Sequence, residues 1–381
     1  MASDAKQPIS GSSQPGGEPK LAKYFRAIVK AGASDLHLKS GKPPHIRKTS
    51  KLQTSPTEAL TSEDILSMAE ELLTPEQSKF FHEHGSVDLA WELEGSDRFR
   101  INVFRQRGRV SLAARRVTKN IPDFKNLHLP PVMEQIAQVQ QGLVLLSGPT
   151  GSGKSTTIAS ILQHINRTRP CHIVTIEDPI EYLFEDDKAL INQREIGIDV
   201  EDFQAGLKYL MRQDPDVVLI GEMRDRDTFQ AALQASETGH LVFGTVHASS
   251  SSQTIGRILD LFPVENHSRI RHSLAFNLQA IICQKLLPSI APDVDRVPAV
   301  DILLANPATR KLIIEQRDAE LPDLIRSHEE RGMKSFTRSL YELIESEMIE
   351  PNVGYEAAPN IDELKMMMKG IKAGQAGLIN R

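Results

Sequence analysis

Two spacings of apolar residues alternate along the first third of the chain. Intervals of three and four residues in LAKYFRAIVKAGA, which begins at Leu21, predict a helix, and a second helix is expected around residues 62–74. Three further segments have a strand-like pattern: SDLHL (34–38), SVDLAWEL (86–93) and RFRINVFRQRGRVSLAARRV (98–117). Because apolar and polar residues alternate there, we predict an α+β domain with antiparallel strands over residues 21–117.

The pattern changes in the middle of the chain. Residues 118–131 contain three prolines and little periodicity, and we expect a linker over residues 118–140. Short apolar runs then alternate with helical stretches: GLVLLSG, HIVTIED, DVVLIGE, HLVFGTV and AVDILLA. Such runs are typical of parallel strands covered by helices on both faces. The prediction is an α/β domain with a mostly parallel sheet over residues 141–305 and a helical region over residues 306–381.

Composition adds few limits to this picture. Hydrophobic residues make up 40% and charged residues 25%, which is ordinary for a soluble protein, and the net charge of −5 does not favour nucleic acid as a partner. Cys171 and Cys283 are too few for a disulfide framework or a thiolate zinc site. Residues 1–20 are expected to be a disordered tail and not a signal peptide. No apolar run reaches the roughly 18 residues of a membrane helix, so a cytoplasmic location is expected.

A phosphate-binding motif follows the first of the apolar runs. GPTGSGKST matches the pattern G-x-x-x-x-G-K-[ST], between a predicted strand and the predicted helix TTIASILQHI. Its glycines let successive backbone N–H groups face phosphate oxygens, Lys154 reaches the β- and γ-phosphates, and Ser155 offers a hydroxyl to Mg²⁺. The predicted ATP-binding residues are Gly148, Pro149, Thr150, Gly151, Ser152, Gly153, Lys154, Ser155 and Thr156.

Acidic residues follow two other predicted strands. Glu222 ends DVVLIGE, and TIEDPIEY supplies Glu177, Asp178 and Glu181. Ligands bind at the carboxyl ends of strands in open α/β sheets, so both groups are predicted to face the phosphate motif. We interpret Glu222 as the acid linked to Mg²⁺, with Ser155 and Asp178 as further ligands, partly through water. Glu181 or Glu177 would orient the attacking water. The alternative is that each group is a strand end that faces solvent.

Two histidines bracket the apolar run in ETGHLVFGTVHA. His247 ends the predicted strand, at the nucleotide face, and His240 begins it, at the opposite edge. Because the pKa of histidine lies near neutrality, His247 is a candidate sensor of the γ-phosphate. The alternative for each ring is a satisfied core histidine, and a metal site is not expected because the segment lacks further ligands.

Taken together, these segments resemble the type II/IV secretion ATPase family, and within it the ATPases of type IV pilus retraction and twitching motility. The matching segments, within residues 21–350, are SDLHL, GPTGSGKST, TIEDPIEY, NQRE, DPDVVLIGEMRD and ETGHLVFGTVH. NPATRKLIIE (306–315) is similar to the retraction motif of that branch, with departures at Thr309, Lys311 and Ile314. We expect this segment to matter for force output more than for chemistry.

The resemblance implies a fold, an assembly and partners. It implies a PAS-like N-terminal domain, a RecA-like P-loop ATPase domain, and a hexamer with ATP and Mg²⁺ bound between subunits. The motor would lie in the cytoplasm, peripheral at the inner membrane. It would act on an inner-membrane platform protein and, indirectly, on pilin. His240 and His247 correspond to the His box of the family.

The arginine-rich strands acquire a role from the same resemblance. Seven arginines lie between residues 98 and 116, and Arg100 and Arg115 match arginines of family members. An arginine finger that reaches a neighbour's γ-phosphate accelerates other nucleotide hydrolases by roughly 10³–10⁵. Arg100 and Arg115 are therefore candidate catalytic residues. The alternative is a solvated or salt-bridged strand face.

Three other functions remain open at this point. A pilus-extension or type II secretion ATPase would carry the same motifs. A RecA-like nucleic-acid motor would need a basic channel or stacking aromatic residues, yet aromatic residues are only 5% of the chain. A regulatory protein that binds ATP without turnover is disfavoured by the complete set of Lys154, Ser155, Glu222 and Glu181.

Overall fold

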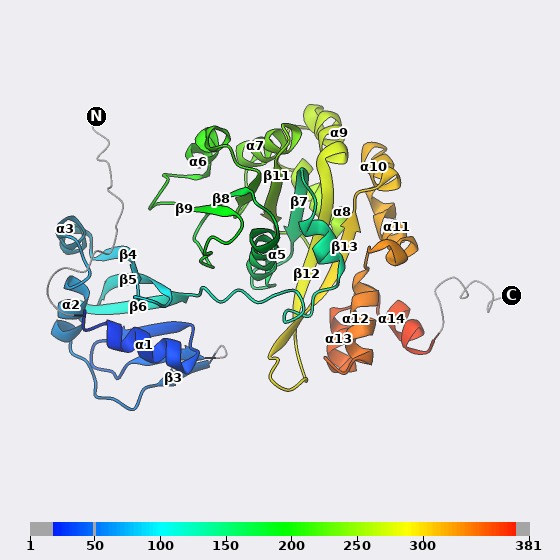
Figure 1. Cartoon of the computed structure of the whole chain (residues 1–381). Helices are drawn as coiled ribbons and strands as arrows, with labels where there is room; N and C mark the ends of the chain where they lie inside the picture. The colour runs from blue at the N-terminus through cyan, green and yellow to red at the C-terminus, as the bar shows by residue number, and fades with distance from the viewer. Residues whose placement is uncertain (1–17, 49–50, 371–381) are drawn as a thin grey trace. The chain divides into compact units, whose positions relative to one another are not determined.

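The computed structural model describes residues 18–48 and 51–370, which form two compact units (Figure 1). The first unit comprises the described residues as far as Asn120 together with Glu181–Leu183, and the second comprises the remainder. Most of the expected disordered tail, and the chain after residue 370, lie outside the described residues.

The first unit contains a six-stranded antiparallel sheet. Its strands, in the order in which they pair, are β3 (Lys51–Thr54), β2 (His45–Lys48), β1 (Asp35–Lys39), β6 (Arg109–Val117), β5 (Arg98–Gln106) and β4 (Ser86–Glu92). Its helices are α1 (Ala22–Ala31), α2 (Ser62–Glu70) and α3 (Pro75–His84). Phe99, Ile101 and Val103 of β5 are buried, and the ring of Phe99 stacks on Phe25 of α1 with 4.2 Å between centroids. The alternation along β5 thus leaves Arg98 and Arg100 on the other face of the sheet, whereas Arg105 lies on the same face as the buried residues, over the ring of Phe81.

The second unit is built on a seven-stranded sheet. In order, its strands are β13 (Arg296–Leu304), β12 (Leu278–Pro288), β7 (Gly142–Ser147), β11 (Leu241–Val246), β10 (Val217–Ile220), β8 (His172–Glu177) and β9 (Leu190–Glu195). All neighbours pair in parallel except β12 and β13, which are antiparallel. Strands β7, β10 and β11 are fully buried, which explains their uninterrupted apolar sequences.

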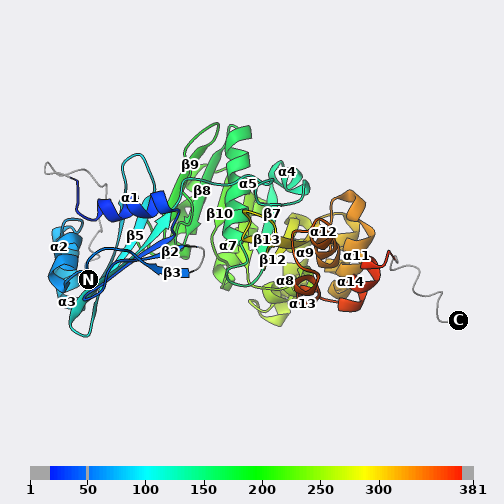
Figure 2. The same cartoon turned by 90° about the horizontal axis from the view of Figure 1, so that it is seen from below.

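Helices cover both faces of this sheet (Figure 2). On one face are α4 (Val132–Ala137) and α5 (Lys154–Thr168). On the other face are α6 (Phe203–Leu210), α7 (Arg226–Glu237), α8 (Ser251–Leu259) and α9 (His267–Asn277). Five helices follow β13: α10 (Pro307–Ile314), α11 (Leu321–Ser327), α12 (Phe336–Glu345), α13 (Pro351–Ala357) and α14 (Ile361–Met368).

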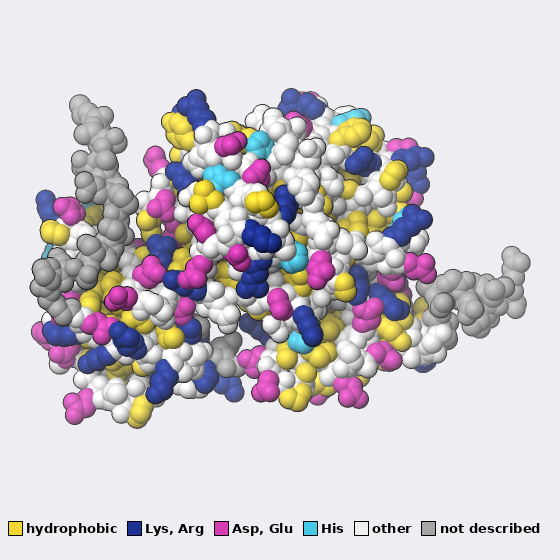
Figure 3. Space-filling view, viewed as in Figure 1, with side chains coloured by type: hydrophobic (Ala, Val, Ile, Leu, Met, Phe, Trp, Pro, Cys, Tyr) yellow, Lys and Arg dark blue, Asp and Glu magenta, His cyan; other side chains and the backbone are white. Residues whose placement is uncertain are grey.

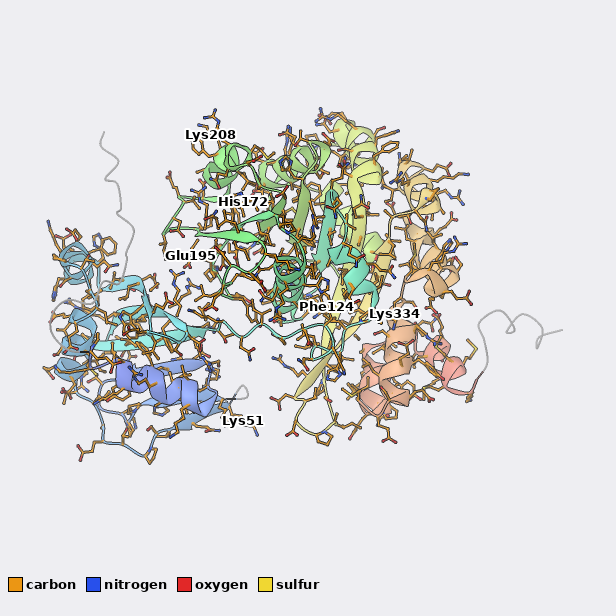
Figure 4. All side chains as sticks on the ribbon, in the orientation of Figure 1. Lys51, Phe124, His172, Glu195, Lys208 and Lys334 are labelled. Carbon is orange, nitrogen blue, oxygen red and sulfur yellow. The ribbon has the colours of Figure 1, made fainter. Side chains whose placement is uncertain are left out.

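One expectation needs correction. The predicted linker, residues 118–140, includes α4, whose Val132, Met133 and Ile136 are buried. Phe124 of the same segment (Figure 4) is buried. Its ring centroid lies 5.3 Å from that of His164 on α5, so much of the segment belongs to the core.

Helix α10 covers most of NPATRKLIIE, the segment expected to matter for force output. Thr309, Leu312 and Ile313 are buried, whereas Lys311 and Glu315 are exposed. Replacing the buried residues would test core packing and not force output. Within residues 18–48 and 51–370, no helix combines the length and the hydrophobicity that a membrane span requires.

Candidate functional site

The phosphate motif forms a loop between β7 and α5. Gly148, Gly151 and Gly153 have φ values of 150°, 79° and 87°, a backbone conformation that side chains disfavour. A Cβ atom at Gly148 would lie 2.5 Å from the carbonyl oxygen of Gln284 on β12. Helix α5 begins at Lys154 with no acidic residue in its first turn. Its positive N-terminus therefore faces the loop, which suits a phosphate anion.

The Lys154 side chain lies within the loop. It is only 9% exposed, and its Nζ donates hydrogen bonds to the carbonyl oxygens of Gly148 (2.9 Å) and Pro149 (3.1 Å). Ser155 follows in the first turn of α5 and is half-buried. The ammonium group is thus held inside the loop, against two of its carbonyl oxygens.

Glu222 and His247 meet at the carboxyl ends of β10 and β11. His247 Nε2 donates a hydrogen bond to Glu222 Oε1 at 2.9 Å, and Arg224 forms an ion pair with the same carboxylate. The pairing of β7 with β11 places Ser147 opposite Val246, so His247 and Gly148 are each the next residue after paired strand ends. The structure therefore brings the predicted sensor and one predicted acid to the start of the phosphate loop.

Backbone contacts fix the position of Glu222. Gly221 N donates to Ile176 O (2.8 Å), and Gly221 O accepts from Thr245 Oγ1 (2.7 Å). A Cβ atom at Gly221 would lie 3.2 Å from the Cα atom of Glu177, tighter than ordinary contact. The glycine that precedes Glu222 thus allows β8 and β10 to approach closely.

The acids of TIEDPIEY are distributed differently from the prediction. Glu177 ends β8, opposite Glu195 at the end of β9 (Figure 4), and accepts hydrogen bonds from Thr175 Oγ1 (2.7 Å) and Gln193 Nε2 (3.2 Å). Asp178 is exposed. Glu181 is also exposed and lies in the short segment that groups with the first unit. Hydrogen bonds within the second unit therefore orient Glu177, whereas Glu181 belongs to the segment that groups with the first unit.

His240 has a local structural partner. Its Nδ1 donates to the carbonyl oxygen of Ala235 (2.9 Å) in the last turn of α7, and its own carbonyl oxygen accepts from Gly142 N (3.0 Å). Both contacts lie at the amino ends of β7 and β11, away from the phosphate loop. His240 therefore caps a helix and joins two strands.

Three arginines and one aspartate of the first unit form a row across its sheet. The strand register places Arg47, Asp35, Arg115 and Arg100 opposite one another on successive strands. Arg115 Nε donates to Asp35 Oδ1 at 2.9 Å, while its side chain remains 71% exposed. Arg115 thus has a carboxylate partner within the same chain and a guanidinium that solvent still reaches.

The sequence did not indicate several residues that hold the phosphate loop and the backbone near Glu222 and His247. Gln284 contacts the phosphate loop, and Thr245 holds the backbone next to Glu222. Ser147 Oγ donates to Ala248 O (3.0 Å) and accepts from Ala248 N (3.1 Å), which fixes the residue after His247. In the described part of the chain, no group of three or more His, Cys, Asp or Glu residues is arranged to hold a metal.

Comparison with known proteins agrees with this geometry. Residues 111–346 match the family described as "Type II/IV secretion system protein". The chain is 39% identical over 321 residues to the type IV pilus retraction ATPase PilT of Pseudomonas aeruginosa, covering 84% of this chain and 93% of PilT. It is 34% identical over 351 residues to the type IV pilus ATPase PilU of the same organism, covering 92% and 91%.

A solved structure extends the similarity to three dimensions. The structure of the pilus retraction motor PilT with bound ADP has a TM-score of 0.84 and 41% identity, and the match covers 92% of this chain and all of that chain. The phosphate loop and these similarities identify a nucleotide-binding P-loop ATPase. The chain belongs to the type II/IV secretion ATPase family.

Proposed function

We propose that this chain is the ATP-driven motor of type IV pilus retraction. One observation carries the proposal: the P-loop and the Glu222–His247 pair lie on a fold that matches the PilT retraction motor over nearly the whole chain. The match extends beyond the ATPase core into the first unit, which is similar to the corresponding part of that motor.

The proposed chemistry assigns a task to each residue near the loop. ATP supplies the phosphoanhydride bond that is hydrolysed. Lys154 and the loop's N–H groups bind the β- and γ-phosphates. Ser155 and Glu222, with Asp178 through water, would hold Mg²⁺ against those phosphates. Glu177, or Glu181 after a rearrangement, would orient the attacking water, and His247 would report the state of the γ-phosphate through its hydrogen bond to Glu222.

The proposed assembly is a hexamer with a PAS-like first domain and a RecA-like second domain. The domain boundaries would follow those predicted from the sequence, with α4 added to the ATPase core. Arg100 and Arg115 would act on the nucleotide of a neighbouring subunit. The motor would be cytoplasmic and peripheral at the inner membrane, where it would engage the platform protein of the pilus and, through it, pilin.

Nucleic acid is not a proposed partner. On the face shown in Figure 3, acidic and basic side chains are interspersed, whereas a DNA motor needs a continuous basic surface.

Gene deletion tests the proposed role. Loss of a retraction motor should leave cells with excess surface pili and no twitching, and a Lys154→Ala gene should fail to restore twitching. Cells without surface pili would instead indicate an extension ATPase, and blocked protein export would indicate a secretion ATPase. ATPase activity that rises on addition of DNA would revive the nucleic-acid alternative.

A further inference from the structure

Gln284 of β12 lies directly against the phosphate loop, and its side chain is buried, with the residue 2% exposed. Its Nε2 donates a hydrogen bond to the carbonyl oxygen of Ser152 (2.7 Å), and its Oε1 accepts one from Thr157 Oγ1 (2.8 Å). One amide thus joins the loop and the first turn of α5 to the neighbouring strand. We infer that Gln284 is a positioning residue that sets the loop's conformation for nucleotide binding.

The contact with Ser152 controls a backbone donor. In a trans peptide, the C=O and N–H groups point in opposite directions. Because Gln284 anchors the Ser152 carbonyl on β12, the N–H of Gly153 points away from β12. A loop that cradles phosphate needs its N–H groups turned inward in this way. Gln284 therefore selects one orientation of the Ser152–Gly153 peptide.

Two glycines of the motif are required by the same residue. A Cβ atom at Gly153 would lie 2.7 Å from Gln284 Nε2, and one at Gly148 would lie 2.5 Å from Gln284 O. Gln284 thus touches both the beginning and the end of the phosphate loop. The close approach of β12 explains why neither position has room for a side chain.

The amide is specific because its two ends have different partners. The Nε2 end faces an acceptor and the Oε1 end faces a donor. Gln284→Met keeps a similar size but leaves the Ser152 carbonyl without its donor. Gln284→Glu keeps the acceptor for Thr157 and places a carboxylate oxygen against that carbonyl. Both changes should free the peptide to rotate.

The test measures ADP affinity and steady-state ATP hydrolysis of the full-length protein. For Gln284→Met and Gln284→Glu we expect the Kd for Mg·ADP and the KM for ATP to rise about ten-fold, equivalent to about 1.4 kcal/mol. The kcat at saturating ATP should stay within about three-fold. Thr157→Val, which removes the other partner, should raise both constants by about three-fold. Gln279→Met is the matched control because Gln279 lies on the same strand, beside Gly142 at its far end.

Affinity, and not stability, decides the outcome. A fall in Tm with an unchanged Kd in the Gln284 variants would show that Gln284 contributes only to the packing of the core. That result would overturn the inference. Wild-type affinity in Gln284→Glu would overturn it as well, since that variant lacks the donor to Ser152. If the Gln284 variants do not fold, wild-type affinity of Thr157→Val is the overturning result. None of these measurements depends on whether the motor retracts pili.

Discussion

A buried carboxylate should make the stability of the second unit depend on pH. Asp301 of β13 is enclosed between strands and α8, and its Oδ1 accepts a hydrogen bond from Ser251 Oγ at 2.6 Å. Burial raises the pKa of Asp301 to about 6, although the hydrogen bonds from Ser251 and the charge of Lys285 lower it. The nearby thiol of Cys283 is also buried, and burial raises its pKa, so it stays neutral.

The sign and size of the effect follow from this shift. The ordinary pKa is 3.8 and the folded value is about 6, and one unit corresponds to about 1.4 kcal/mol. The folded state binds the proton more tightly, so the contribution is fully present below pH 3.8 and is lost as the pH rises through about 6. The ionised carboxylate therefore costs on the order of 3 kcal/mol at neutral pH relative to its protonated form.

Asp301→Asn isolates this term because the amide oxygen still accepts from Ser251 without a charge. At pH 7.5 we expect the variant to be more stable than the wild type by up to about 3 kcal/mol, with the difference shrinking toward pH 4. Urea unfolding across this pH range, at one protein concentration, measures the difference. Asp323→Asn is the control, since the Asp323 side chain is 74% exposed. A stability difference that does not change with pH would refute the reasoning.

Three further predictions concern the nucleotide site and α10. Lys154→Ala should lose both ATP binding and hydrolysis because the phosphates lose their cation, and Glu222→Gln should lose hydrolysis while it still binds ATP; turnover at the wild-type rate in Glu222→Gln would show that another acid is essential. His247→Ala should slow hydrolysis by ten-fold or more with little change in Tm, whereas His240→Ala should lower Tm because α7 loses its cap; the reverse pattern would exchange the two roles. Lys311→Glu, on the exposed side of α10, should leave ATPase activity within about two-fold and reduce twitching; equal loss of both would contradict a role in force output.

The apolar runs predicted most strands of the second unit because each run coincides with a strand that is buried over most of its length. The prediction failed where that correspondence breaks. Strand β9 is an edge strand with only Glu195 fully buried, so LINQRE carries no apolar signal. Strand β12 was missed for a different reason. The helical spacing of Ile270 and Leu274 in α9 continues through Leu278, and no proline or glycine marks the end of the helix at Asn277.

In the site as well, residues close together in the sequence could be predicted, whereas contacts between distant segments could not. The phosphate motif was predictable because its glycines, Lys154 and Ser155 act within one loop. The partners of that loop were not, since Gln284 follows Lys154 by more than a hundred residues and reaches it only through the order of the strands. The ion pair between Arg115 and Asp35 could likewise not be predicted, because it depends on the register of β1 and β6.

Strand order also explains how one hydroxyl connects three parts of the site. Ser147 ends β7 immediately before the phosphate loop, and β7 lies between β12 and β11. Its Oγ holds Ala248 through two hydrogen bonds and accepts a third from Thr254 Oγ1 of α8 at 3.0 Å. A shift of the loop that moves Ser147 must therefore move the residue next to His247, or break these hydrogen bonds, of which the one from Thr254 is buried. Because unpaired buried groups are costly, the loop, the His247 segment and the start of α8 are expected to move as one body when the nucleotide changes.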